Sequence, residues 1–444
     1  MNLPEIFVRN TTELLGSEFQ DLEKALEDIA PTSVRVNDKM DYIPSNEKVP
    51  WCEMGFYLNE RPLFTADPLF HAGVYYVQEA SSMFLYQAVK QYFPTAQTVL
   101  DLCAAPGGKS TLLTQALHEN SLLVSNEIVR SRAYILAENL IKWGNPNVIV
   151  TNNEPKDFKS LPGFFDAVVV DAPCSGEGMF RKDAGAIHEW SEYNVTLCAA
   201  RQKEILLSVW DTLKTDGVLV YSTCTFNSEE NEENVKWICD ELGAELLPLD
   251  LNGNGQITLT DYGYRFFPHK TKGEGFFLTV LKKNSMIQST QKNKRDDKKN
   301  LKFVTKSNDI TFSLLESDRW MILPEDNLLK GYDKNRLNDI LFIKKHLKCM
   351  HSGLLLGEFK GRDFIPSSSI ALSKKLDKES VEKVEVNYKT AISFLRKDAI
   401  TLPDSPRGYI LICFKGQSLG WVKNLGNRTN NLYQQEWRIR MKIE

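Results

Sequence analysis

Short apolar runs alternate with longer helical patterns through the middle of the chain. Five runs are rich in branched apolar residues and end at polar or turn-forming residues, as buried strands do: 98–103, 121–125, 147–151, 164–170 and 217–221. Helical patterns follow most of them, at 110–118, 130–143, 195–213 and 230–242. Repeated strand–helix units of this kind predict an α/β protein with a doubly wound, mostly parallel sheet, closed by a hairpin over 264–281.

The pattern changes on both sides of this region. Residues 1–30 have apolar positions at helical spacing, and 33–37 alternate as a strand does, which predicts a small N-terminal α+β domain, 1–93. The α/β domain then covers 94–283. Residues 284–300 are polar and predict a linker. An intermediate segment, 301–385, precedes short strands with glycine turns, which predict a small β-rich module over 386–444.

Composition narrows the class of protein. The 444 residues have a net charge of −4, so any nucleic-acid surface must be local. The start of the chain does not resemble a signal peptide, and no apolar run approaches the roughly 20 residues that span a bilayer. The eight cysteines form no CxxC pair, which argues against a disulfide framework or a zinc site. We expect a cytoplasmic, monomeric protein that needs neither a metal nor a membrane.

Two predicted strands end in cysteines. The run 164–170 leads into Asp171, Pro173 and Cys174, and the run 217–221 leads into Cys224. Both thiols should reach the edge of the sheet where ligands bind in α/β folds. A thiolate adds to an electron-poor ring carbon such as C6 of cytosine, which turns C5 into a nucleophile for a methyl group, and a nearby carboxylate stabilises the adduct. The alternative is that each cysteine is a small buried hydrophobe, and we accept it for the other six.

The first predicted strand runs into a glycine turn, 101–110. Adjacent Gly107 and Gly108 let the backbone approach a ligand, and the following helix offers free N–H groups. Glu127 ends the next strand, where an acidic residue can accept both hydroxyls of a ribose. S-adenosylmethionine therefore fits better than a nucleoside triphosphate. Gly108 and Lys109 also imitate a P-loop NTPase, but Cys103 stands where that motif needs glycine. A purely structural turn is the remaining alternative.

These motifs resemble those of the Sun-type RNA cytosine-C5 methyltransferases. The matching stretches are 73–83, 101–109, 171–176, 222–224 and 265–269, within a similarity that covers about 30–283. The resemblance implies a Rossmann-like class I methyltransferase fold, with Cys224 attacking C6 and Cys174 assisting release of the product. Spacing alone does not decide which cysteine attacks. Asp171 and Lys109 would complete the catalytic group and face the target base.

The same resemblance assigns the binding residues. S-adenosylmethionine would contact Cys103, Ala104, Ala105, Pro106, Gly107, Gly108, Lys109, Glu127, Asn153 and Asp171. The family usually has aspartate where this chain has Asn153, and an amide could still contact the adenine amine. The end of the chain resembles that of the bacterial ribosomal small-subunit methyltransferase F group, in which a PUA-like RNA-binding module follows the catalytic domain. Candidate RNA contacts are Pro173, Arg428, Tyr433 and Arg438.

The function predicted from these residues is methyl transfer from S-adenosylmethionine to C5 of cytosine in RNA, through a covalent bond between Cys224 and C6. The expected substrate is 16S rRNA or the small ribosomal subunit. A tRNA substrate is an alternative within the same chemistry. A P-loop NTPase that depends on Lys109 and a non-catalytic RNA-binding factor are the alternatives of another class.

Overall fold

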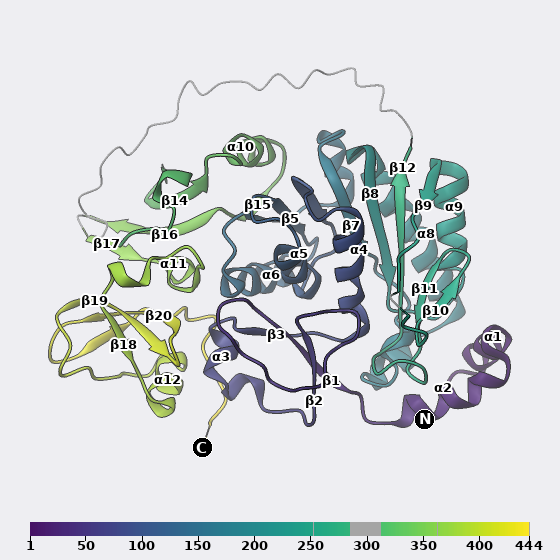
Figure 1. Cartoon of the computed structure of the whole chain (residues 1–444), viewed down its shortest axis with the longest axis horizontal. Coiled ribbons are helices and arrows are strands. Elements are labelled where there is room, and N and C mark those ends of the chain that lie inside the picture. The colour runs from purple at the N-terminus through teal and green to yellow at the C-terminus, as the bar shows by residue number, and fades with distance from the viewer. Residues whose placement is uncertain (252, 285–311, 362, 444) are drawn as a thin grey trace.

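The computed structural model describes residues 1–251, 253–284, 312–361 and 363–443. The predicted linker, 284–300, lies outside the described residues except for Asn284. N-terminal helices and the last β-sheet lie at opposite ends of the molecule, with the large sheet between them (Figure 1). Within the described ranges no helix has the length and apolar character needed to cross a membrane.

The central sheet has five parallel strands at its core. In spatial order they are β8 (Leu213–Thr223), β7 (Phe165–Asp171), β4 (Thr98–Asp101), β5 (Leu122–Asn126) and β6 (Val148–Thr151). This confirms the predicted doubly wound α/β core. Antiparallel strands extend it beyond β8: β12 (Phe276–Lys283), β11 (Gly263–Phe266), β10 (Thr258–Thr260) and, on β12, β9 (Ala244–Leu246).

The other edge of this sheet comes from the C-terminal half of the chain. Strand β15 (Cys349–Ser352) pairs antiparallel with β6. Its sequence, Cys-Met-His-Ser, has no alternating apolar pattern, so no local pattern predicts this pairing. The C-terminal segment therefore completes the same sheet that carries the two cysteines.

Alternate residues of the parallel strands face opposite layers of helices. Val168 and Val170 pack on one side, and Ala167 and Val169 on the other. The first layer consists of α8 (Glu192–Val209), α9 (Glu232–Leu242) and α10 (Leu337–His346). The second consists of α4 (Leu85–Tyr92), α5 (Gly108–Ala116) and α6 (Arg130–Trp143). Burial on both faces explains why these strands read as continuous apolar runs.

The N-terminal region forms the predicted helices and a three-stranded antiparallel sheet. Its elements are α1 (Glu5–Leu15), α2 (Phe19–Glu27), β1 (Thr32–Val36), β2 (Gly55–Leu58), α3 (Pro68–His71) and β3 (Tyr75–Val77). The helical pattern predicted over 1–30 extends too far, because α2 ends at Glu27. Ile29, which has helical spacing from Leu22 and Leu26, lies beyond this end and is 97% exposed.

Two further sheets follow in the C-terminal half. One contains β13 (Trp320–Glu325), β14 (Leu328–Asp333), β16 (Leu354–Lys360) and β17 (Asp363–Pro366). The last contains β18 (Lys383–Glu385), β19 (Gly408–Phe414), β20 (Gln417–Asn424) and β21 (Thr429–Asn431), with α11 (Ser368–Leu372) and α12 (Tyr388–Leu395) beside it. Strand β18 pairs with β19, so this sheet begins before residue 386.

Buried polar contacts join the three parts of the chain. The ammonium group of Lys39, in the N-terminal part, donates to the carbonyls of Ala72, Lys142 and Leu372 at 2.9, 2.5 and 2.8 Å. Beside it, a cavity of about 590 Å³ lies where β5 and β6 begin, at the opposite edge of the sheet from the two cysteines. Its position excludes it as the place where the predicted thiol chemistry occurs.

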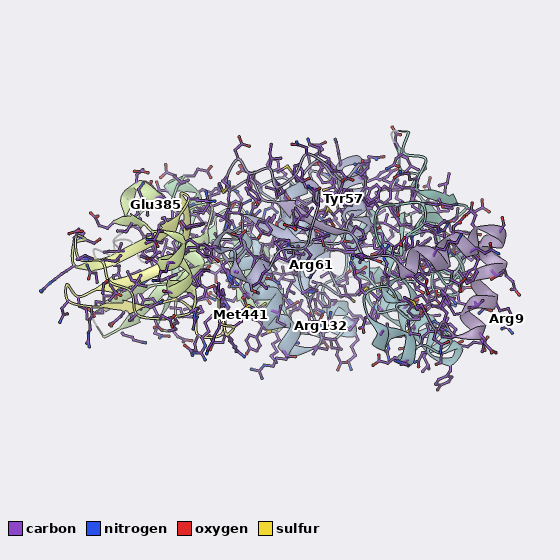
Figure 2. All side chains as sticks on the ribbon, turned by 90° about the horizontal axis from the view of Figure 1, so that it is seen from below. Arg9, Tyr57, Arg61, Arg132, Glu385 and Met441 are labelled. Carbon is purple, nitrogen blue, oxygen red and sulfur yellow. The ribbon has the colours of Figure 1, made fainter. Side chains whose placement is uncertain are left out.

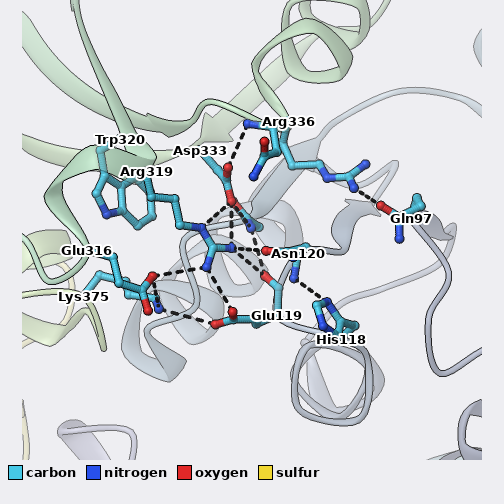
Figure 3. Close-up of polar contacts among 12 residues, drawn as sticks. Gln97, His118, Glu119, Asn120, Glu316, Arg319, Trp320, Asp333, Arg336 and Lys375 are labelled. Atoms are coloured by element: carbon cyan, nitrogen blue, oxygen red, sulfur yellow. Dashed lines mark hydrogen bonds and ion pairs between the residues drawn. The ribbon is translucent and has the colours of Figure 1, made fainter.

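Arg319 is the centre of the polar network between the C-terminal segment and the central sheet (Figure 3). Its guanidinium contacts Asp333 at 2.7 Å and donates to Asn120 Oδ1 at 2.6 Å. The side chain of Asp333 is completely buried and accepts from Asn147 on the central domain. Lys375 adds ion pairs with Glu119 and Glu316.

We expect Arg319→Ala to lower the free energy of unfolding by about 3 kcal/mol, because it leaves the buried Asp333 carboxylate without its charged partner. Urea unfolding followed by circular dichroism measures the change. Lys360→Ala is the matched control, since Lys360 pairs with Glu358 at the surface and should contribute less than about 1 kcal/mol. Equal losses in the two variants would contradict this account of the junction.

Candidate active site

The structure brings the two predicted cysteines together. Cys174 follows β7 and Cys224 follows β8, and these strands are parallel neighbours with Asp171 opposite Ser222. The two sulfur atoms are 3.1 Å apart, and the backbone N–H of Cys224 donates to the sulfur of Cys174 at 3.4 Å. Both side chains are partly exposed. The register of β7 and β8 therefore places the two thiols side by side at the edge of the sheet.

A charged pair lies beside the thiols. Lys109 Nζ is 2.8 Å from Asp171 Oδ2, and the hydroxyl of Ser222 donates to Asp171 Oδ1 at 2.8 Å. Burial lowers the pKa of Lys109, but attraction to Asp171 and the hydrogen bond to it outweigh burial and raise the pKa overall. Lys109 therefore stays charged. Its ammonium also lies 5.1 Å from the ring centroid of Phe276.

The glycine turn is held in place by α6. Gly107 has φ of +117°, and a Cβ there would come within 3.3 Å of Leu136 on that helix, so glycine is needed for conformation and for space. Arg132 donates to the carbonyl of Ala105 at 2.9 Å, and Asn139 donates to that of Pro106 at 2.8 Å. The loop 103–109 is thus a shaped backbone surface at the start of α5.

Glu127 lies at the same edge, just after β5. Its side chain is almost fully buried, accepts from the N–H of Val129 at 2.9 Å and lies 3.6 Å from Arg132. A carboxylate oxygen has further lone pairs for a ligand in this position. Arg132 itself is half exposed and lies near the middle of the face shown in Figure 2. Sequence reasoning identified Glu127 but missed Arg132.

Asn153 is engaged by the C-terminal segment. Its amide donates to the carbonyl of Lys348 at 3.1 Å and accepts from the N–H of the same residue at 3.1 Å. Lys348 comes just before β15, so this contact follows from the strand that the sequence did not reveal. The amide keeps a second N–H and a second lone pair for a ligand, and a contact between Asn153 and an adenine stays a prediction.

The predicted RNA-contacting residues divide into two groups. Pro173, Arg428 and Arg438 are exposed. Tyr433 is completely buried and lies against Phe394 with ring centroids 5.4 Å apart, so it is a core residue of the last sheet. The prediction that Tyr433 stacks on an RNA base is therefore wrong. A single aromatic residue among basic residues does not reveal whether its ring faces the core or solvent.

A buried polar network behind Cys174 was also missed. Glu230 accepts from the N–H of Ser175 at 3.0 Å and from the side chain of Gln202 at 2.8 Å. Burial raises the pKa of Glu230 to about 7. The signal in the sequence was weak: Glu230 looks like an ordinary acidic residue before a helix, and Gln202 is one polar residue on the buried face of α8.

Asp101 carries a second perturbed carboxyl group, below the glycine turn. It is completely buried, accepts from the Ser110 hydroxyl at 2.6 Å, and its other oxygen has no partner among the described residues. Burial raises its pKa to about 7. Because the pKa is higher in the folded state, the stability from this group is greatest below the unfolded pKa of about 4 and is lost as the pH rises towards 7.

The variant Asp101→Asn removes this titration while keeping an acceptor for Ser110. We expect its free energy of unfolding, relative to wild type, to increase by about 2 kcal/mol between pH 5 and pH 8. Urea unfolding of the free protein at several pH values gives this difference. Asp404→Asn changes an exposed carboxylate and is the control. A stability difference for Asp101→Asn that is the same at pH 5 and pH 8 would rule out the assigned titration.

Comparisons with known proteins agree on one family. Residues 93–282 match the family described as 16S rRNA methyltransferase RsmB/F. Residues 3–80 match the N-terminal domain of 16S rRNA methyltransferase RsmF, and residues 381–439 match the methyltransferase RsmF PUA domain. The three matches include the parallel sheet, the N-terminal strands and the last sheet.

Similar proteins include two named ribosomal RNA small subunit methyltransferase F. The protein from Psychromonas ingrahamii is 32% identical, over 87% of this chain and 84% of its own. That from Erwinia tasmaniensis is 31% identical, over 98% and 96%. A solved methyltransferase homologue from Pyrococcus horikoshii is 29% identical with a TM-score of 0.55, over 63% of this chain and 95% of its own. This chain therefore belongs to the RsmB/F family of 16S rRNA methyltransferases.

Proposed function

We propose that this chain transfers a methyl group from S-adenosylmethionine to C5 of a cytosine in 16S rRNA. The observation that carries the proposal is the thiol pair, with sulfur atoms 3.1 Å apart, next to the Lys109–Asp171 ion pair. Methylation at an oxygen or an amino nitrogen requires no thiol nucleophile. Methylation at a pyrimidine carbon does, because C5 becomes nucleophilic only after a nucleophile adds at C6.

The residues around the glycine turn fit S-adenosylmethionine. The start of α5 offers backbone N–H groups to a carboxylate, as the amino-acid end of the cofactor requires. Glu127 has a buried carboxylate at the end of β5, where it can accept ribose hydroxyls. We assign the binding surface to loop 103–109, Glu127 and Asp171. When bound there, the cofactor supplies an electrophilic methyl group.

The roles of the chain's own residues follow from their chemistry. Cys224, as a thiolate, would attack C6, and the electron pair of the C5–C6 double bond would move into the ring. Asp171 would hold the polar edge of the cytosine, with Lys109 balancing its charge. After methyl transfer, Cys174 would take the proton from C5, and the returning electron pair would expel Cys224 from C6. The attacking cysteine is thus restored.

RNA contact would come from the face shown in Figure 2 and from the C-terminal module. The last residues of the chain reach back to the N-terminal part, since Thr65 Oγ1 lies 3.0 Å from Met441 Sδ. Arg428 and Arg438 are exposed on this module and can bind phosphates. The names of the relatives favour small-subunit rRNA over tRNA. We further propose that the chain acts as a monomer in the cytoplasm.

The contacts of Lys109 argue against the P-loop NTPase alternative. A P-loop lysine must reach the phosphates, whereas Lys109 is bound to Asp171, the residue that would have to hold the metal ion. The geometry therefore favours the methyl-transfer proposal.

We expect Cys174→Ala to accumulate a protein–RNA adduct that survives SDS, because the C5 proton is no longer removed and Cys224 is not released. The double variant with Cys224→Ala should form no adduct. Incubation with small-subunit rRNA and S-adenosylmethionine, followed by denaturing gel electrophoresis, measures this. Cys198→Ala, at another partly exposed thiol, should behave like wild type. An adduct that persists without Cys224 would refute the assigned roles.

We expect Glu127→Gln to weaken S-adenosylmethionine binding by about tenfold, since hydrogen bonds to a charged acceptor contribute about 1.5–3 kcal/mol. Isothermal titration calorimetry without RNA measures the affinity. Glu154→Gln is the control, because Glu154 lies after β6 near the same edge of the sheet but is exposed. An unchanged affinity for Glu127→Gln would remove Glu127 from the binding site.

A further inference from the structure

The two thiols are not in equivalent surroundings, because the buried network that holds the loop of Cys174 contains a carboxylate. The residues that flank Cys224 bind the neutral side chain of Asn231, at 2.6 and 3.0 Å. Gln202 donates to the carbonyl of Pro173 at 2.9 Å and to Glu230 at 2.8 Å. Glu230 in turn accepts from the N–H of Ser175 at 3.0 Å. The residues on both sides of Cys174 are therefore fixed by two side chains that also bind each other.

Two further side chains set the orientation of the Gln202 amide. Asn234 donates to Gln202 Oε1 at 2.7 Å, and the Tyr221 hydroxyl lies 3.0 Å from the same oxygen and 2.6 Å from the carbonyl oxygen of Glu230. With its oxygen occupied, the amide of Gln202 must point its NH₂ group at Pro173 and Glu230. Gln202, Asn234 and Glu230 are all completely buried. The carboxylate of Glu230 is thus held in one position behind the Cys174 loop.

The electrostatic surroundings of Glu230 are defined by few groups. Burial raises the pKa of Glu230 most, and the hydrogen bonds from Ser175 and Gln202 lower it in part. Repulsion from Glu177, on the loop after β7, is a smaller effect that raises it. The neutral titratable groups that face it are Cys174, Cys198 on α8 and Tyr221 on β8. Of these groups, Cys174 directly precedes Ser175, whose N–H donates to Glu230.

Cys224 has the opposite kind of neighbour. The charged Lys109 interacts favourably with Cys224 as well as with Asp171. For Cys174, the hydrogen bond that its thiol donates to Cys224, then burial and then repulsion from Cys224 and Glu230 raise the pKa of the thiol. The N–H of Cys224 opposes this change, as the smallest of these effects. Cys224 therefore has a cation among its neighbours, whereas Cys174 has a carboxylate.

We propose that Glu230 is the positioning residue that makes the two thiols unequal: its carboxylate keeps the proton of the pair on Cys174 and leaves Cys224 as the sulfur that attacks. This deepens the proposed function and rests on it. It also gives a physical reason for the choice of nucleophile, which sequence spacing left open. Glu230 acts through Cys174 and does not touch the substrate.

The proton balance closes over one cycle. Cys224 starts as a thiolate and forms the bond to C6, while Cys174 is still protonated. Once Cys224 is bonded to carbon it no longer carries charge, so Cys174 releases its proton to solvent more readily. The Cys174 thiolate then takes the proton from C5 as the bond between Cys224 and C6 breaks. The pair returns to its starting state, with one proton on Cys174.

Alkylation of the free enzyme by iodoacetamide tests this directly, because the reagent reacts with thiolates. Peptide mass spectrometry gives the separate rates at residues 174 and 224, under reducing conditions and without RNA or cofactor. In wild type we expect Cys224 to react about tenfold faster than Cys174 at pH 8.5. This preference should shrink towards pH 6, because Glu230 loses its charge around pH 7.

In Glu230→Gln the preference at pH 8.5 should fall at least threefold and no longer vary with pH, whereas Glu230→Asp should restore part of it. Glu229→Gln removes the same charge one residue away and should match wild type. An unchanged preference in Glu230→Gln, or faster alkylation of Cys174 in wild type, would overturn the proposal. Should Glu230→Gln fail to fold, a wild-type preference that is constant from pH 6 to 8.5 would overturn it equally.

The experiments distinguish a failure of the proposed function from a failure of the proposed role of Glu230. Loss of methyl transfer to rRNA in every form of the protein would count against the proposed function while leaving the alkylation result intact. If the proposed function holds, the pH profile of methyl transfer gives a second readout of Glu230. A merely structural role would lower the rate of Glu230→Gln equally at all pH values, whereas the charge effect predicts a larger loss above pH 7 than below it.

Discussion

The parallel pairing of β7 with β8 is the constraint on which the rest of the structure depends. Asp171 lies opposite Ser222 in this register, so the chain segments that follow the two strands leave the sheet together. Parallel strands that are buried on both faces have a fixed register. A shift of one residue would move every side chain to the opposite face of the sheet, where it would meet the other layer of helices. The 3.1 Å separation of the sulfur atoms is thus fixed by the core of the protein.

The surrounding elements refine that arrangement. Helix α6 holds the glycine turn through Arg132 and Asn139, and α8 supplies Gln202 to the loop of Cys174. The C-terminal half adds β15 to the far edge of the same sheet and is tied to it through Arg319 and Asp333. The catalytic domain and the predicted RNA-binding module therefore share a continuous scaffold.

The sequence was sufficient to predict those features that depend on the local pattern of apolar and polar residues. The apolar runs predicted the parallel strands, and the residues at their ends predicted that Cys174, Cys224 and Asp171 share one edge. It was insufficient where contacts join residues far apart in the chain. Asn153 meets Lys348, and Glu230 meets Gln202, through pairings that no local pattern records. Tyr433 was misread because a lone aromatic residue has no periodicity from which its direction can be inferred.

The central claim is that Cys224 forms the bond to the pyrimidine while Cys174 faces the same ring. An RNA that carries 5-fluorocytidine at the target position tests it most directly, because fluorine at C5 cannot leave as a proton and the wild-type enzyme stays attached after methyl transfer. Proteolysis and mass spectrometry of the complex then identify the attached residue. The account predicts a nucleotide on Cys224. A nucleotide on Cys174, or no covalent complex while RNA and cofactor are both bound, would contradict it.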